Sequence, residues 1–136
     1  AKGGAEGGSL PLRIRLAGKE MKQPVAKYSM EDFDRIVRRD YPAETHEEVR
    51  NTLGEYGNEK WQIDPLRVRM ACLKLADGDL HSLRKCVRDA CGDYRDVLAW
   101  AEYPAYMRAH GQDEQEKAIH QDWAELQQWL HRDRDE

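Results

Sequence analysis

The feature that most constrains the fold is the helical spacing of apolar residues, which recurs from residue 30 to residue 131. In segment 30–40 the spacing places Phe33, Ile36 and Val37 on one face of a helix. The last segment, 113–131, has a similar stripe made by Ile119, Trp123, Leu126 and Leu130. Amphipathic helices must bury their apolar faces against other elements, so the pattern predicts a helical bundle.

A more apolar segment lies between these two helices. Asp64-Pro65 is a strong helix start signal, because Asp is a favoured N-cap and proline at the first helical position has its φ preset. The helix that follows, to about Asp77, is apolar around most of its circumference, so we expect it at the centre of the core. Its apolar residues are Leu66, Val68, Met70, Cys72, Leu73 and Leu75.

Local signals set the bounds of the first two helices. Ser29 is a candidate N-cap for the first helix, which Tyr41-Pro42 ends because the residue before proline disfavours the α conformation. Residues 45–48 read Thr-His-Glu-Glu, a capping box in which Thr45 caps the amide of Glu48. The second helix then runs to Gly54 or Gly57.

A five-residue pattern occurs twice, fourteen residues apart, at 76–80 and 90–94. In each copy glycine, Gly78 or Gly92, is expected to end a helix in the left-handed conformation, and the following aspartate caps the next helix. The pattern therefore predicts tight corners around helices at about 80–91 and 94–102. Pro104 and Gly111 separate the last helix from them.

The fold class that we expect is all-α, a compact orthogonal bundle of five to six short helices with an extended N-terminal arm. We expect a disordered tail at 1–9, an extended basic arm at 10–28, a single helical domain at 29–131 and a charged tail at 132–136. The glycine-rich start lacks the apolar residues needed for a packed segment.

The arm contains the one segment with strand periodicity. Leu12, Ile14 and Leu16 alternate with Arg13 and Arg15, but no second strong strand candidate follows. Residues 1–28 carry six bases and two acids, whereas the rest of the chain carries sixteen bases and twenty-four acids. The basic arm either folds back onto the acidic body, pairs with another chain or reaches an anionic partner.

Composition excludes several classes. Hydrophobic residues make up 40% and charged residues 35%, and no run approaches the roughly 20 apolar residues of a spanning helix. We therefore expect a soluble cytoplasmic protein without membrane contact. The odd number of cysteines, three, argues against a secreted disulfide framework. No phosphate-binding glycine loop is present, and we expect no cofactor.

The metal and nucleophile candidates are weak. Cys72, His81, Cys86 and Cys91 are spaced too widely for the close ligand pairs of zinc sites, so we expect no metal and interpret the cysteines as small core residues. An enzyme using His81 or Cys86 is the second alternative, because Lys85 and Arg88 flank Cys86 and a reactive thiol needs an electropositive setting.

Nucleic-acid binding is the first alternative function. Arg84, Lys85 and Arg88 form a small basic face on one predicted helix, and the first helix carries a second one at Arg35, Arg38 and Arg39. The acidic helical body opposes this interpretation, since it repels phosphates.

The aromatic segment from Trp100 to Tyr106 is the strongest candidate site. Trp100, Tyr103 and Tyr106 gather around a helix end, and Trp and Tyr are residues that anchor interfaces. The structural alternative is that these aromatics close one end of the core. Our hypothesis is a non-enzymatic interaction module that docks an unidentified protein partner, with Arg13 and Arg15 adding a strand or a basic contact. The sequence does not specify the oligomeric state.

Overall fold

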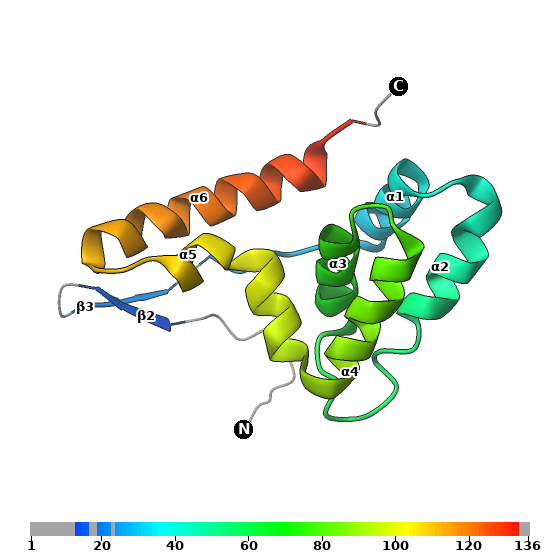
Figure 1. Ribbon diagram of the computed structural model, residues 1–136, viewed down its shortest axis with the longest axis horizontal. Coiled ribbons are helices and arrows are strands. Elements are labelled where there is room, and N and C mark those ends of the chain that lie inside the picture. Colours follow the sequence, from blue (N-terminus) through cyan, green and yellow to red (C-terminus); the bar gives the residue numbers. More distant parts are fainter. Residues whose placement is uncertain (1–12, 17–18, 23, 134–136) are drawn as a thin grey trace.

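The computed structural model describes residues 13–16, 19–22 and 24–133, the first two segments at the level of the backbone (Figure 1). It confirms the all-α class. A hairpin precedes the helices, with strands β2 (Arg13–Leu16) and β3 (Lys19–Lys22). The helices are α1 (Met30–Asp40), the 3-10 turn η1 (Ala43–Thr45), α2 (His46–Leu53), α3 (Pro65–Ala76), α4 (Leu80–Glu102), α5 (Pro104–Arg108) and α6 (Gln112–His131).

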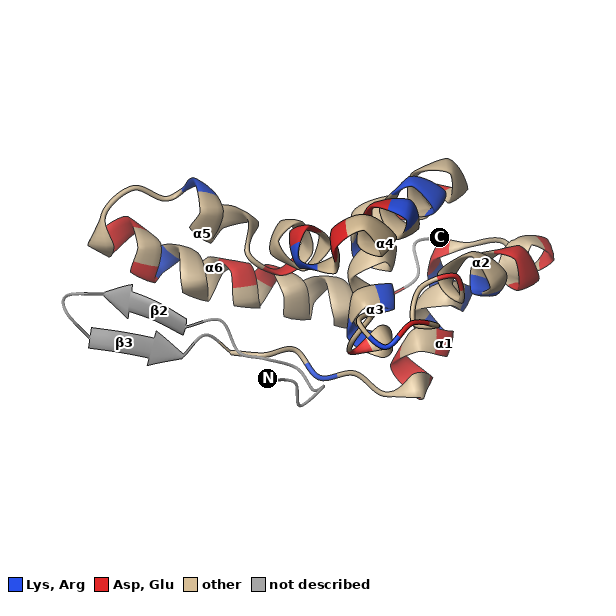
Figure 2. Cartoon of the chain, turned by 90° about the horizontal axis from the view of Figure 1, so that it is seen from below, with Lys and Arg blue, Asp and Glu red and all other residues tan. Residues whose placement is uncertain are grey.

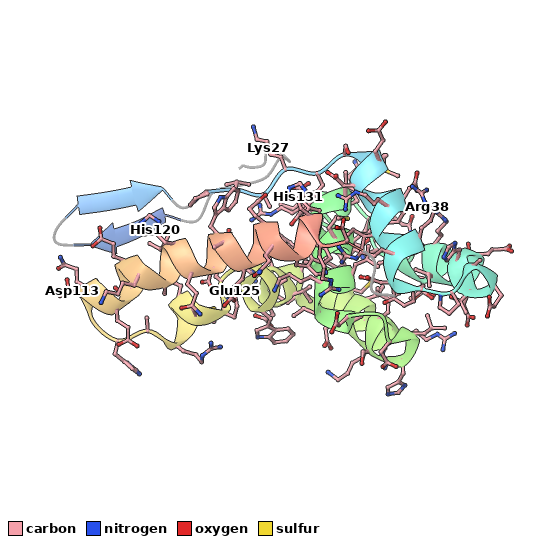
Figure 3. All side chains as sticks on the ribbon, turned by 90° about the horizontal axis from the view of Figure 1, so that it is seen from above. Lys27, Arg38, Asp113, His120, Glu125 and His131 are labelled. Atoms are coloured by element: carbon pink, nitrogen blue, oxygen red, sulfur yellow. The ribbon has the colours of Figure 1, made fainter. Side chains whose placement is uncertain are left out.

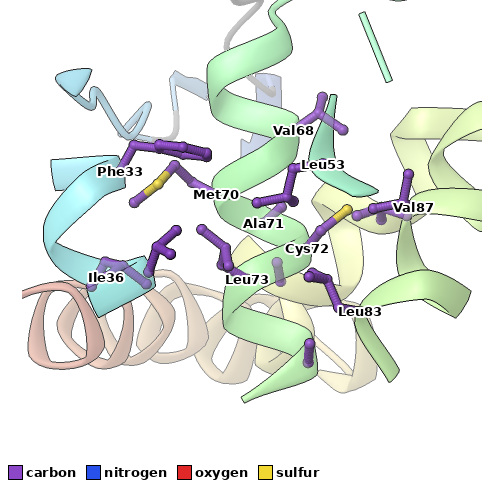
Figure 4. Close-up of a cluster of buried hydrophobic side chains, with 14 of the residues drawn as sticks. Phe33, Ile36, Leu53, Val68, Met70, Ala71, Cys72, Leu73, Leu83 and Val87 are labelled. Atoms are coloured by element: carbon purple, nitrogen blue, oxygen red, sulfur yellow. The ribbon is translucent and has the colours of Figure 1, made fainter. Parts of the chain in front are cut away.

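Helix α3 lies at the centre of the core, as its apolar sequence predicts. Figure 4 shows Phe33 and Ile36 of α1 on one side of it and Leu83 and Val87 of α4 on the other. The α3 side chains that fill the space between them are fully or almost fully buried: Val68, Met70, Ala71, Cys72 and Leu73. Burying such side chains is the main favourable term in folding, at roughly 25 cal/mol per Å² of apolar surface.

Ser29 and Thr45 both take the N-cap positions predicted for them, but the capping box predicted at Thr45 is wrong, because its side chain makes no capping hydrogen bond. Ser29 and Asp32 form a reciprocal capping box, with both backbone-to-side-chain hydrogen bonds at 3.0 Å. The Thr45 hydroxyl instead donates to the Pro42 carbonyl at 2.8 Å. Thr45 is also the last residue of the turn η1, which runs directly into α2. Its hydroxyl therefore bonds to the residue before this turn and not to an amide in the first turn of α2.

At the start of α3, proline occupies the first helical position as predicted. Asp64 takes the N-cap position in a left-handed conformation, at φ 48°, but its side chain makes no capping hydrogen bond. The side chain of Arg69, from α3, caps the end of the preceding helix α2. Arg69 donates to the carbonyls of Leu53 and Tyr56, at 3.0 Å and 2.6 Å.

The two predicted corners differ. Gly78 is left-handed, at φ +86°, and Asp79 caps α4 by accepting from the Ser82 amide at 2.9 Å, so the first corner is confirmed. Gly92 is not left-handed, and the second corner is a kink inside α4, at the extended residue Asp93. The helices predicted at 80–91 and 94–102 are therefore both present, as two helical arms of α4 that meet at this kink (Figure 1).

The expectation of an unpaired strand is wrong. Strands β2 and β3 pair antiparallel, from Arg13 opposite Lys22 to Leu16 opposite Lys19. The second strand reads Lys-Glu-Met-Lys, which has a single apolar residue and so lacks an alternation signal. Two residues, Ala17 and Gly18, connect the strands, and a two-residue connection with glycine favours a hairpin. The predicted tail at 1–9 and residues 134–136 lie outside the described residues.

The second arm of α4 packs with α5 and α6, and α6 runs back from the hairpin end of the molecule to α1 (Figure 1). Ile119, Leu126 and Leu130 of the predicted stripe are buried, and Trp123 packs against the core. Within the part of the chain that the structure describes, no helix has the length and apolar character needed to cross a membrane.

Candidate functional site

Trp100 lies on the second arm of α4 and is 48% exposed, although Val97 and Ala101 of the same helix are buried. Two further large side chains follow it on α5. Met107 is 59% exposed and Tyr106 is partly buried. We call Trp100, Tyr106 and Met107 the aromatic surface. Covering an exposed apolar side chain removes its surface from water, which favours association with a partner.

Tyr103 is buried, with 6% of its surface exposed, and belongs to a polar network beneath the aromatic surface. Arg67 of α3 makes a two-point ion pair with Glu102, at 3.0 Å and 2.6 Å, and donates to the Tyr103 hydroxyl at 3.0 Å. Burial alone would lower the pKa of Arg67, but the hydrogen bonds and attraction to Glu102 outweigh it and raise the pKa. Tyr103 is therefore buried within this network and is not one of the exposed residues of the aromatic surface.

A second buried carboxylate holds the start of α5. Asp122 of α6 accepts hydrogen bonds from the amides of Ala105 and Tyr106, at 2.9 Å and 3.0 Å. These are amides of the first turn of α5, which have no partner within the helix. Burial raises the pKa of Asp122, whereas these two hydrogen bonds favour its charged form and oppose the rise. The carboxylate thus ties α5, and with it Tyr106, to α6.

Together, the contacts of Glu102 and Asp122 fix the backbone that carries Trp100 and Tyr106. Both ends of the link between α4 and α5 are held, through Glu102 on one side and through the Tyr106 amide on the other. A side chain on a rigid support loses less conformational entropy on binding, which favours affinity. No motif in the sequence indicates this support, because Arg67 and Asp122 are distant from the segment that they hold.

Trp61 is a useful comparison, because it is exposed to a similar extent, 50%, in the loop between α2 and α3. This loop is held by Gln62, whose side-chain oxygen accepts from the amides of Gly57, Asn58 and Glu59 at 2.8–3.1 Å. Trp129, in contrast, is buried at 7% exposure, with the Arg39 guanidinium 5.6 Å from its ring centroid. Trp129 is therefore a core residue.

The nucleic-acid candidates on α4 are largely paired with acids. Arg84 forms an ion pair with Glu48 of α2, and Lys85 lies 3.2 Å from Asp89. Arg88 is exposed and has no polar partner among the described residues. Figure 2 shows acidic positions beside the basic ones on the first arm of α4. Neighbouring carboxylates reduce the attraction of such a face for phosphates.

The enzyme candidates lie in an unfavourable setting. His81 is exposed, and Cys86 is partly buried with its pKa raised by burial and by the nearby Asp89, against a smaller opposing effect of Lys85. Burial also raises the pKa of Cys72. A raised pKa disfavours the thiolate, which is the nucleophilic form. Among the described residues, no three metal-binding side chains lie close enough together to hold an ion.

Arg13 and Arg15 occupy β2, and their side chains lie outside what the structure describes. In the two-stranded sheet of the described residues, each strand pairs on one side only.

A basic cleft of about 470 Å³ lies where α6 ends against α1. In Figure 3 the end of α6 that carries His131 adjoins α1, which carries Arg38. Five of the six residues that line the cleft are basic: Arg35, Arg38, Arg39, His131 and Arg132, with Asp133 as the sixth. The sequence indicates the basic face of α1, but the contribution of residues more than ninety positions away depends on the tertiary structure.

Comparison of the chain with protein-family models, with curated proteins and with solved structures found no match.

Proposed function

We propose that the protein is a non-enzymatic protein–protein interaction module whose aromatic surface docks a protein partner. The observation that carries the proposal is Trp100, which is 48% exposed on a helix whose end is held by the buried pair of Arg67 and Glu102. Tryptophan is among the residue types most enriched at the centres of interfaces. In the proposed complex its side chain enters an apolar pocket of the partner.

Two further features support the same surface. Met107 and Tyr106 follow on α5, and methionine adapts its shape to irregular apolar surroundings. The hairpin is the proposed second contact, because each of its two strands has one edge that is unpaired within the described sheet. An extended segment of a partner adds to such an edge through backbone hydrogen bonds.

The first test is an affinity capture from a lysate of the native cells, with and without nuclease, using the wild-type protein, Trp100→Ala and Trp61→Ala. We expect one stoichiometric protein partner that survives nuclease and is captured by the wild type and Trp61→Ala. Removing an interface anchor costs about 2 kcal/mol or more, so Trp100→Ala should bind the purified partner roughly thirtyfold more weakly. Thermal unfolding of both variants checks that they remain folded.

Equal affinity of Trp100→Ala and the wild type, in a folded protein, would contradict the proposed surface. Captured material that disappears with nuclease would favour the nucleic-acid alternative instead. In that case, substitution of Arg88 should weaken the binding of a duplex and make it less dependent on salt.

A further inference from the structure

The basic cleft at the end of α6 is independent of the aromatic surface and has chemistry of its own. Its lining comes from two elements that the fold brings together, with Arg35, Arg38 and Arg39 from α1 and His131, Arg132 and Asp133 from the end of α6 and the residues after it. Positions 35, 38 and 39 are three and four residues apart, so they share one face of α1.

Part of this positive charge stabilises the fold. Arg39 is almost completely buried and makes a two-point ion pair with Asp40, at 2.7 Å and 3.1 Å. It also donates to the carbonyls of Trp129 and Arg132, at 2.7 Å and 3.0 Å, while Arg35 donates to the Leu130 carbonyl at 2.7 Å. These bonds satisfy carbonyls at the end of α6, whose partial negative charge would otherwise repel an anion.

The remaining hydrogen-bond donors of the cleft are available to a ligand. Arg38 and His131 are exposed and have no hydrogen bond or ion pair within residues 24–133. Arg35 is 38% exposed and uses two of its N–H groups, on Leu130 and Asp32, out of the five that arginine carries. Arg132 is also partly exposed, with its guanidinium 3.5–3.6 Å from Asp77 and Asp40.

We infer that this cleft binds the phosphoryl group of a small phosphorylated molecule. Arg38 and His131 make the principal contacts, and Arg35 and Arg132 add donors from either side. Asp133 is the only carboxylate among the six lining residues, and it is exposed.

The geometry favours a phosphoryl group over a carboxylate. A phosphate monoester carries a charge of about −1.5 to −2 at neutral pH and offers three strong acceptor oxygens. Guanidinium groups that approach from two elements can contact different oxygens of one such group, whereas a single carboxylate has two. The volume of about 470 Å³ also leaves room for the remainder of a small ligand.

Pyrophosphate is the first probe, and its binding to the full chain is measured by calorimetry at low ionic strength. We expect saturable binding of one pyrophosphate per chain. Arg38→Gln and His131→Gln should each weaken it roughly tenfold, because a hydrogen bond to a charged group contributes about that factor. Arg88→Gln is the matched control, since Arg88 is likewise exposed and without a polar partner in the described part of the chain. Citrate at the same ionic strength tests whether the site prefers phosphoryl groups.

Retained affinity in Arg88→Gln together with loss in Arg38→Gln supports the cleft, and citrate should bind more weakly than pyrophosphate. Three results would overturn the inference: no saturable binding, an equal loss in Arg38→Gln and Arg88→Gln, or equal affinity for citrate. Thermal unfolding without ligand checks the fold, which Arg38→Gln should preserve because Arg38 has no described polar contact to lose. None of these readouts depends on a protein partner, so the proposed function and the cleft can fail separately.

Discussion

Gly78 and Gly92 occupy equivalent positions in the repeated five-residue pattern, yet they have different roles. Gly78 has φ +86°, and a Cβ built on it would lie 3.0 Å from the Asp40 carbonyl oxygen. Gly92 is helical, and a Cβ built there would meet no atom within 4 Å. Only the first glycine is therefore required by the backbone, and the expectation that both are required is wrong at Gly92.

Alanine at the two positions should have effects of opposite direction. Gly78→Ala should destabilise the protein by about 1–2 kcal/mol, the cost of a left-handed conformation for a residue with Cβ, and the close Asp40 oxygen adds to it. Gly92→Ala should be neutral or stabilising by up to about 1 kcal/mol, because alanine loses less entropy in a helix. Urea denaturation measures both, and similar losses of stability in the two variants would contradict this account.

At the scale of elements, the ion pair of Arg67 with Glu102 connects α3 to the end of α4. Both side chains are almost completely buried, at 5% and 3% exposure. Removing two charges from water costs several kcal/mol, and their mutual attraction offsets that cost only with good geometry. The two short hydrogen bonds and the additional bond to Tyr103 provide that geometry.

Breaking one partner should therefore cost more than removing both. Glu102→Gln leaves Arg67 charged and poorly paired inside the protein, so we expect a loss of about 3 kcal/mol or more. Replacing both residues, Arg67→Met with Glu102→Leu, should cost less than either Arg67→Met or Glu102→Leu alone, because no unpaired charge then stays buried. A double-mutant cycle by urea denaturation measures the coupling, and additive single effects would show that the pair contributes little.

The kink in α4 comes from a local sequence signal at Asp93. Asp93 has the non-helical backbone of a helix-capping residue, and its carboxylate accepts from the Arg95 amide at 3.0 Å. The predicted boundary is thus present as a kink. Gly92 is helical and Asp93 is not, so the chain turns at Asp93, and the second arm packs with α5 and α6.

For the molecule as a whole, the contact between α6 and α1 brings together residues that are ninety positions apart in the sequence, such as Arg39 and Trp129. Arg39 is the centre of this contact, since it pairs with Asp40, caps the carbonyls of Trp129 and Arg132 and packs over the Trp129 ring. Its neighbour Arg38 is exposed, has no hydrogen bond or ion pair within the described residues, and lines the basic cleft.

Adjacent arginines should therefore differ sharply on substitution. Arg39→Ala leaves the buried Asp40 without its main partner, and we expect a loss of about 3 kcal/mol with faster hydrogen exchange at the end of α6. Arg38→Ala should change the stability by less than about 0.5 kcal/mol, as is usual for exposed positions. Unchanged exchange in Arg39→Ala would mean that α6 is held by its apolar face alone.

Elements that depend on interactions between neighbouring residues can be predicted from the amino-acid sequence alone. Helical periodicity predicted α1 and α6, the apolar composition after Asp64-Pro65 predicted α3, and local chemistry predicted the N-cap at Ser29, proline at the start of α3 and the left-handed Gly78. Each of these signals depends on residues within about one or a few helical turns of one another. It can therefore be detected in the sequence without the tertiary structure.

The exposure of the aromatic side chains and the pairing of the charged ones depend instead on how the helices pack. Trp61, Trp100 and Trp129 are the same type of residue, but among these three only Trp129 is buried, because α6 packs on α1. The basic cleft and the support beneath Trp100 likewise combine residues from distant segments. These contacts form only when the core brings different helices together, and the pattern of residues within one helix does not show which other helix it will contact.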